Sequence, residues 1–195
     1  MQGRGGEPDR RVTPYHDRRG FKLSNERVFK PLSIAVLTVS DSRDESTDKS
    51  GKSLAQRLTD QGHRLADKKI CKDDIYAIRA HVSAWIADPE INVVISTGGT
   101  GVTGRDGTPE AMTPLFDKTL DGFGEMFRVL SYEDIKTSTL QSRAVAGVAN
   151  ATYIFTLPGS AGAVALAWDS LICHQLDYRT RPCNLVELMP RLLEV

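Results

Sequence analysis

The chain has 195 residues, of which 40% are hydrophobic and 26% charged, and its 25 basic residues balance 25 acidic ones. This length suits one domain with a full core, because a chain of this size buries roughly 70% of the surface that its unfolded form exposes. No apolar run approaches the roughly 20 residues that a membrane helix needs, and three cysteines without C-x-x-C spacing argue against a disulfide framework. We therefore expect a cytoplasmic protein without a membrane segment.

The first 31 residues differ in composition from the rest of the chain. They carry 8 basic and 4 acidic residues and only scattered apolar ones, so they cannot bury enough surface to offset the entropy of ordering. No aromatic side chains alternate with the basic ones, so nucleic acid is not an expected partner. We predict a flexible basic N-terminal tail over residues 1–31 and a single domain over residues 32–195.

The first half of the body alternates strands with helices. Residues 33–39 are a near-continuous β-branched run, typical of a strand buried on both faces. Residues 51–57 and onward predict a helix that ends at Gly62. A shorter strand is predicted over residues 65–71. Apolar residues spaced by three and four over residues 75–86 predict an amphipathic helix.

The second half continues the alternation. Residues 91–95 supply another buried strand, and Thr108 is the expected N-cap of a helix with Pro109 at its first position. The remaining predictions are helices over 122–132, 139–149 and 161–176, and a strand over 151–157. This order predicts an α/β fold with a parallel sheet covered on both sides and a ligand site at the carboxyl ends of its strands.

A glycine-rich segment follows the strand over residues 91–96. Its residues Gly98, Gly99, Thr100 and Gly101 predict a phosphate-binding backbone nest, because glycines adopt positive φ and leave no Cβ beside a phosphate oxygen. Asp106 does not attract a phosphate by its charge, so its presence suggests a divalent cation that neutralises the phosphate. The segment predicts metal-assisted nucleotide chemistry.

Two better-known phosphate motifs fit less well. Gly51, Lys52 and Ser53 resemble the end of a P-loop, but the first glycine of that motif would fall at Ser46. The glycines of residues 99–104 satisfy G-x-G-x-x-G after a strand, yet the helix begins several residues too late. A dinucleotide-binding protein therefore stays a weaker alternative.

Further polar residues are expected at the same edge of the sheet. Each acid taken singly has an alternative interpretation as an N-cap or a solvated loop residue. Taken with Asp106, they could surround a metal–nucleotide complex, and we favour Asp73 or Asp74 as the partner of Asp106. The other candidates are Asp41 and Asp44 after the first strand, and Asp48 and Ser50 before the first long helix.

The remaining chemistry-bearing side chains carry no predicted function. The cysteines Cys71, Cys173 and Cys183 match no structural zinc spacing, so we expect buried or partly buried thiols. We expect His63 and His81 at the surface.

Several motifs in order resemble the molybdopterin-binding family over about residues 34–184. They are Thr97 to Gly101, Asp106 to Ala111, which contains the secondary site candidate Glu110, Gly122 to Glu125, Thr137 to Gly147, Leu157 to Gly159, and Arg179 to Asn184. The resemblance implies a three-layer α/β/α fold with a mostly parallel sheet, trimers that pair into hexamers, and binding of molybdopterin. It also makes other proteins of molybdenum cofactor biosynthesis candidate partners.

Active members of this family adenylylate the molybdopterin phosphate with Mg²⁺-ATP and release pyrophosphate. The resemblance implies that Asp73 and Asp106 are catalytic and hold Mg²⁺, and that the segment 98–101 lies beside the α-phosphate of ATP. It assigns pterin contacts to Ser142, Arg143, Pro158, Gly159 and Ser160. Arg143 would supply a forked charge to a phosphate.

Two departures from the family pattern leave alternatives open. The family's proline before the first aspartate is here Lys72, so the choice between Asp73 and Asp74 rests on register alone. The common L-P-G-N-P segment ends here in Ser160 and Ala161. Because some members have lost catalysis, a non-catalytic molybdopterin-binding or carrier protein stays the alternative to an adenylyltransferase.

Overall fold

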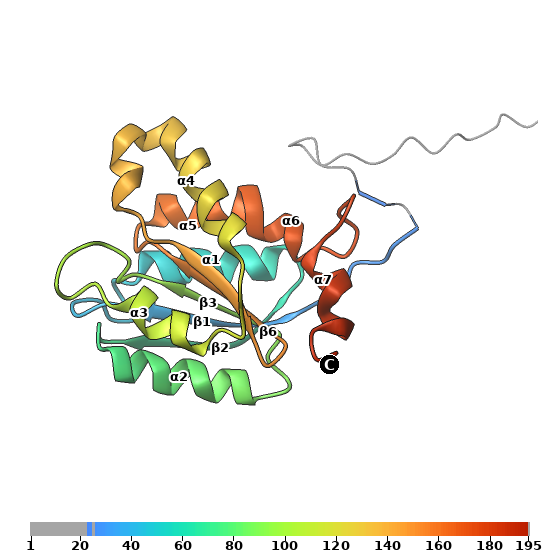
Figure 1. Ribbon diagram of the computed structural model, residues 1–195, viewed down its shortest axis with the longest axis horizontal. Helices are drawn as coiled ribbons and strands as arrows, with labels where there is room; N and C mark the ends of the chain where they lie inside the picture. The colour runs from blue at the N-terminus through green and yellow to red at the C-terminus, as the bar shows by residue number, and fades with distance from the viewer. Residues whose placement is uncertain (1–22, 25, 195) are drawn as a thin grey trace, which may run out of the picture.

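The computed structural model describes residues 23, 24 and 26–194 of the chain. A six-stranded sheet, in the order β2-β1-β3-β6-β5-β4, lies between two layers of helices (Figure 1). The pairs β1–β2, β1–β3 and β3–β6 are parallel, and β5 and β4 are added by antiparallel pairing. The predicted three-layer α/β/α fold with a mostly parallel sheet is confirmed.

The predicted elements appear in the predicted order except for the helix over residues 139–149, described below, and the strand β4 and the helix α7 were not predicted. The strands are β1 Ser33–Val39, β2 Arg64–Cys71, β3 Val93–Thr97, β4 Lys118–Thr119, β5 Val145–Ala149 and β6 Thr152–Leu157. The α-helices are α1 Lys49–Asp60, α2 Ile75–Ala87, α3 Thr108–Met112, α4 Asp121–Ile135, α5 Ala161–Ala167, α6 Cys173–Gln175 and α7 Leu185–Leu188. A π-helical segment, Trp168–Ile172, joins α5 to α6, and short 3₁₀ turns are Thr113–Leu115, Lys136–Gln141 and Met189–Arg191.

The two crossovers that follow β1 and β2 run in opposite directions across the sheet. The chain leaves β1 through α1 to reach β2, and then passes through α2 to β3 on the other side of β1. The first crossover packs α1 on the face that also carries α4 and α5, and the second packs α2 on the face that carries α3 (Figure 1). The carboxyl ends of β1 and β3 therefore form a topological switch point, where open α/β sheets bind ligands.

The helix predicted over residues 139–149 is wrong. A 3₁₀ turn covers Lys136–Gln141, and Val145–Ala149 is the strand β5, paired antiparallel with β6. Asn150 and Ala151 take positive φ values of 45° and 65° in the tight connection between the two strands. The small apolar residues of this segment suit a helix by propensity, but burial between the edge strand β4 and β6 decides for a strand.

The predicted N-cap of α3 is also wrong. Gly107 occupies the N-cap position without a side-chain cap, and the Thr108 hydroxyl donates instead to the carbonyl oxygen of Gly98 at 2.9 Å. Thr108 is fully buried. The hydroxyl therefore ties the start of α3 to the glycine-rich loop rather than to its own helix.

The described residues before β1 run along the C-terminal segment. Leu23 forms a bridge with Thr180, and Arg27 pairs with Glu187 at 2.6 Å. Residues 1–22 and 25 of the predicted tail lie outside the described residues. Within the described part of the chain, no helix combines the length and apolar character that crossing a bilayer requires.

His63 is buried, so its predicted surface position is wrong. Its ring lies 5.0 Å from that of Phe29 and 6.1 Å from that of Trp168, and its Nδ1 accepts from the Leu32 amide. Burial lowers the pKa of His63 to about 4. The neutral ring therefore belongs to the packing that holds the residues before β1.

Candidate functional site

A cavity of about 540 Å³ lies at the switch point between β1 and β3. The loops that follow β1, β3 and β6 form its floor, and α4 with the 3₁₀ turn after it forms one wall. The loops after β1 and β3 lie side by side at the left of Figure 1. The sequence-predicted segment 98–101 lines the cavity at its centre.

The glycine-rich loop has a backbone that only glycine allows. Gly98 and Gly99 have φ values of 110° and 63°. A Cβ at Gly98 would overlap the carbonyl oxygen of Val39, and one at Gly99 would lie 2.6 Å from a carboxylate oxygen of Asp73. The loop therefore brings bare backbone into the cavity, directly against a carboxylate.

Asp106 is held at the tip of the same loop. Its carboxylate accepts from the Thr103 amide at 2.9 Å and from the Thr103 hydroxyl at 2.5 Å. These hydrogen bonds, led by the hydroxyl, hold the pKa of Asp106 below its ordinary value. A Cβ at Gly101 would lie 2.7 Å from this carboxylate, so Asp106 is a preformed anion beside the glycine backbone.

Asp73 faces Asp106 from the loop after β2. It accepts from the Gly107 amide at 3.3 Å, yet its pKa is raised, first by burial and further by the charges of Asp106 and Asp41. Carboxylates with shifted pKa values that share a cavity are typical of a functional site. A cation between Asp73 and Asp106 would relieve the repulsion between their negative charges.

The structure separates Asp73 from Asp74. Asp74 is the N-cap of α2 and accepts from the amides of Tyr76 and Ala77 at 3.0 and 2.8 Å. It is exposed and does not line the cavity, whereas Asp73 does. The geometry therefore favours Asp73 as the partner of Asp106.

Asp41 borders the cavity in an ion pair. It accepts two hydrogen bonds from Arg105, at 2.9 and 2.7 Å, and one from the Asp73 amide at 3.2 Å. Arg105 holds the pKa of Asp41 below its ordinary value. Asp41 thus joins the loops after β1, β2 and β3 into one unit.

Asp48 lies outside the cavity and caps α1. Its fully buried carboxylate accepts from the Gly51 amide at 2.8 Å and from the Thr38 hydroxyl at 3.0 Å, and pairs with Lys68 at 3.0 Å. Its alternative interpretation as an N-cap is confirmed.

The predicted pterin contacts divide into two groups. Ser142, Pro158, Gly159 and Ser160 all line the cavity. The Ser142 hydroxyl oxygen is buried without a hydrogen-bond partner among the described residues, so it is available to a ligand. The Ser160 hydroxyl accepts from the amide of Ala163 and caps α5.

Arg143 lies behind the glycine-rich loop rather than in the cavity. Its guanidinium donates to the carbonyl oxygens of Gly101 and Asp106 at 2.7 and 2.6 Å, and it pairs with Glu110. Arg143 is not among the residues that line the cavity. Its forked charge therefore fixes the loop, and Glu110 serves that purpose with it.

Sequence reasoning missed the arginine that does line the cavity. Arg43 lies in the loop after β1 and donates from Nη1 to the Ser50 hydroxyl at 2.7 Å. Ser50, a secondary candidate, is buried in the first turn of α1. The available signal was a basic residue in a loop at the carboxyl edge of the sheet.

Only two of the acidic candidates face one another across the glycine backbone. Among the described residues, no group of three or more histidine, cysteine, aspartate or glutamate side chains converges as a metal site would require. Asp73 and Asp106 could hold a divalent cation only together with oxygen ligands from elsewhere, such as the phosphates of a nucleotide.

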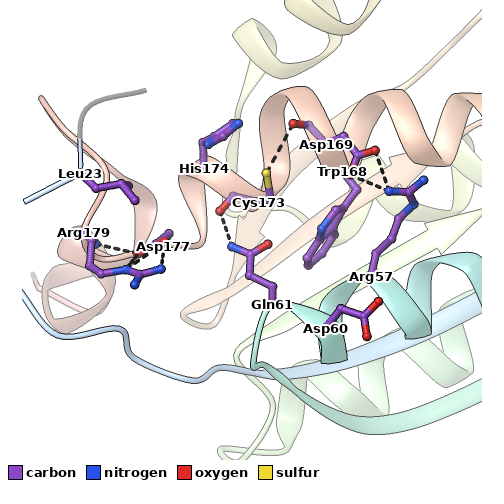
Figure 2. A pocket seen from close by; sticks show the side chains of 10 residues that line it. All are labelled: Leu23, Arg57, Asp60, Gln61, Trp168, Asp169, Cys173, His174, Asp177 and Arg179. Carbon is purple, nitrogen blue, oxygen red and sulfur yellow. Dashed lines mark hydrogen bonds and ion pairs between the residues drawn. The ribbon is translucent and has the colours of Figure 1, made fainter. Parts of the chain in front are cut away.

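A second cavity, of about 400 Å³, lies between α1 and the helical segment 161–175 (Figure 2). Its polar side chains interact with one another: Arg57 bonds to Asp169 at 2.6 Å, and Arg179 bonds to Asp177 at 2.7 Å. Gln61 donates to the Cys173 carbonyl oxygen at 2.8 Å. The contacts of Arg57 and Gln61 join α1 to the helical segment 161–175.

Comparisons with known proteins place this chain among relatives of one family. Residues 35–178 match a family model described as a probable molybdopterin binding domain. Molybdenum cofactor biosynthesis protein B of Escherichia coli K12 is 58% identical over 156 residues, which cover 80% of this chain and 92% of that protein. The protein of the same name from Bacillus subtilis is 48% identical over 147 residues, 75% of this chain and 86% of that protein. A crystal structure of a molybdenum cofactor biosynthesis protein B superposes with a TM-score of 0.75 at 43% identity, covering 77% of this chain and 94% of that one.

Proposed function

The chain belongs to the molybdopterin-binding domain family and has a role in molybdenum cofactor biosynthesis, and we propose that it is a molybdopterin adenylyltransferase. In the proposed reaction, an oxygen of the molybdopterin phosphate attacks the α-phosphorus of ATP. The bond between that phosphorus and the oxygen bridging to the β-phosphate breaks. The products are adenylyl-molybdopterin and pyrophosphate.

The observation that carries this proposal is the glycine backbone with a carboxylate against each side. Gly99 lies against Asp73 and Gly101 lies against Asp106, in a cradle that a Cβ would fill. Amide groups at such a loop suit phosphate oxygens, and the two carboxylates suit Mg²⁺ shared with those oxygens. Mg²⁺ would neutralise the phosphate charge that the carboxylates otherwise repel.

The chain's own residues would then act mainly by positioning. Thr103 holds Asp106, Arg143 holds the carbonyl groups of Gly101 and Asp106, and Thr108 holds that of Gly98. Nucleotidyl transfer depends on such positioning and on electrostatic stabilisation, because the protein forms no covalent bond with the substrate. Ser142 and the segment 158–160 would contact the pterin.

The test is a product assay. Purified protein mixed with molybdopterin and Mg²⁺-ATP should release pyrophosphate and form the adenylated pterin, both measured by chromatography under anaerobic conditions. Tight molybdopterin binding without product would reject the adenylyltransferase in favour of a second candidate, a non-catalytic carrier. Ser160 and Ala161, which depart from the family's segment, are the observation that favours this second candidate.

We also propose a homo-oligomer, a trimer or a pair of trimers. Four apolar side chains of α4 are exposed: Met126, Val129, Tyr132 and Ile135, at 48%, 61%, 48% and 49% exposure. Several large exposed apolar side chains on one helix favour an interaction surface, and Ile135 also lines the cavity. Light scattering of the wild type and of Val129→Glu tests it, and a monomeric wild type would reject it.

A further inference from the structure

We propose that Arg43 binds the phosphate group of the pterin substrate and holds it for attack, a role that the sequence assigned to Arg143. The inference rests on the proposed function and adds to it the residue that receives the acceptor's charge. A phosphate monoester carries about −1.5 to −2 charges near neutral pH. It needs a cation to enter a cavity that Asp41, Asp73 and Asp106 also line.

Arg43 is the one lysine or arginine among the described residues that line this cavity. It is half-buried, and its guanidinium has a single hydrogen bond within the described chain, from Nη1 to the Ser50 hydroxyl. No carboxylate of a described residue pairs with it. An arginine has five N–H donors in a planar fork, so most of this fork is available to an anion.

The neighbouring arginines are already engaged. Arg105 binds Asp41 through two nitrogens, and Arg143 binds two carbonyl oxygens and Glu110. Neither lines the cavity. A ligand that drew either of them in would have to break a charged pair, whereas Arg43 has no such pair with any residue that the structure describes.

The backbone on both sides of Arg43 is fixed by short-range hydrogen bonds. The Ser40 hydroxyl accepts from the Arg43 amide at 3.2 Å. The Asp44 carboxylate accepts from the Ser46 hydroxyl and from the amides of Ser46 and Thr47, the last two at 2.8 and 3.0 Å. These hydrogen bonds, above all the one from the Ser46 hydroxyl, lower the pKa of Asp44 to about 2. The guanidinium is thus presented from a folded turn.

The position of Arg43 assigns it to the acceptor rather than to the nucleotide. Ser50 anchors it to α1, which packs on the same face of the sheet as α4 and α5 (Figure 1). Ser160 at the start of α5 and Ser131 of α4 line the cavity on that face. Asp73 and Asp106 instead precede α2 and α3, which pack on the opposite face. The elements that hold Arg43 and those that follow the two carboxylates therefore pack on opposite faces of the sheet.

Arg43→Gln tests the inference through binding alone. Affinity for molybdopterin, measured by anaerobic equilibrium dialysis, should fall about 10- to 100-fold, the loss expected for a charge-assisted phosphate contact. Affinity for Mg²⁺-ATP, measured by calorimetry, should change less than about twofold. Dephosphorylated molybdopterin should bind the wild type and the variant equally. Arg43→Lys keeps the charge but not the planar fork, so its affinity for molybdopterin should lie between those of the wild type and of Arg43→Gln.

Lys49→Gln is the matched control, because Lys49 is an exposed cation beside Ser50 that does not line the cavity. Its affinity for molybdopterin should equal that of the wild type, and circular dichroism checks that each variant is folded. Unchanged molybdopterin binding by Arg43→Gln, or a loss of equal size for Mg²⁺-ATP, overturns the inference. A wild type that binds molybdopterin through Arg43 but forms no adenylate rejects the proposed reaction and leaves the inference standing.

Discussion

The two sides of the switch-point cavity are built from opposite kinds of group. On the side of α2 and α3, two carboxylates lie against glycine backbone, and one of them has a raised pKa because of burial and neighbouring charge. On the side of α1, α4 and α5, the described lining residues are uncharged, mostly hydroxyl-bearing or apolar, apart from the cation Arg43. The first side suits a metal and the second suits an organic anion, which is the division that the proposed reaction requires.

The difference follows from how each side is held. The carboxylate side is fixed by loop-to-loop contacts, such as the Arg105–Asp41 pair and the bonds of Arg143 to the glycine-rich loop. The other side takes its shape from helices that pack on the larger core. Substitutions on the first side should therefore change chemistry and stability, and those on the second side should change binding.

The largest effect is expected for Asp106→Asn. If Asp106 holds Mg²⁺ as proposed, removal of its charge should lower turnover by about 100- to 1,000-fold, because electrostatic stabilisation dominates this class of transfer. Affinity for molybdopterin should stay within about twofold. The rate of pyrophosphate release measures the first quantity and equilibrium dialysis the second.

Asp134→Asn is the matched control, because Asp134 is exposed on α4 and does not line the cavity. Its turnover should equal that of the wild type. Full turnover by Asp106→Asn would mean that the carboxylate of Asp106 is not needed for the reaction. It would reject the assignment of catalysis to the side of the cavity that carries the two carboxylates.

The next effect is on folding. Arg143→Ala should lower the free energy of unfolding by about 1–3 kcal/mol, because the carbonyl groups of Gly101 and Asp106 lose their donor. Arg143→Lys should recover little of this, since one ammonium group cannot reproduce the fork. Urea unfolding measures the change. An Arg143→Ala protein that is as stable as the wild type but binds molybdopterin weakly would instead show that Arg143 contacts the ligand.

A smaller effect separates the two catalytic candidates by sign. Asp73 has a raised pKa, so its favourable contribution to stability is complete below its ordinary value of 3.8 and is lost as the pH rises through the folded-state value. Asp73→Asn should therefore melt higher than the wild type at pH 7, by about 1–3 °C, with the difference vanishing in acid. Asp106 has a lowered pKa, so its contribution is present above the ordinary value and is lost as the pH falls.

Asp106→Asn should accordingly melt lower than the wild type at pH 7, and the gap should close as the pH falls through the lowered pKa of Asp106. Scanning calorimetry of both variants between pH 3 and pH 7 measures the two trends. Shifts of the same sign would contradict the opposed electrostatic environments of the two carboxylates.

The sequence predicted the parts of the fold that follow from local periodicity. The buried run of β1 and the spacing of α2 appear where predicted, because a strand buried on both faces and an amphipathic helix leave strong patterns. The strand β5 was missed, since Val145–Ala149 carries small residues whose strand pairing depends on β4 and β6. Its state is decided by contacts far away in the sequence.

The same distinction applies to the site. The glycine-rich loop could be predicted, because the positive φ values of its backbone require glycines and those glycines are visible in the local sequence. The orientation of Arg143 could not, since it depends on where Gly101, Asp106 and Glu110 lie after folding. Arg43 was missed for the same reason: its exposure to the cavity depends on a hydrogen bond to Ser50 in another element.

That hydrogen bond gives the smallest predicted effect. Ser50→Ala removes the one acceptor that the guanidinium of Arg43 has among the described residues, and affinity for molybdopterin should fall by about 2- to 10-fold, the usual size of a single hydrogen bond. Affinity for Mg²⁺-ATP should not change. Equilibrium dialysis and calorimetry measure the two affinities.

The double variant Arg43→Gln/Ser50→Ala shows whether Ser50 acts through Arg43. If it does, the two losses will not add, and the double variant will bind molybdopterin as Arg43→Gln does, because Ser50 has nothing left to orient. Additive losses would mean that Ser50 contributes independently of Arg43. In that case the two sides of the cavity would still differ in charge, but the hydrogen bond that anchors Arg43 to α1 would not determine the protein's affinity for molybdopterin.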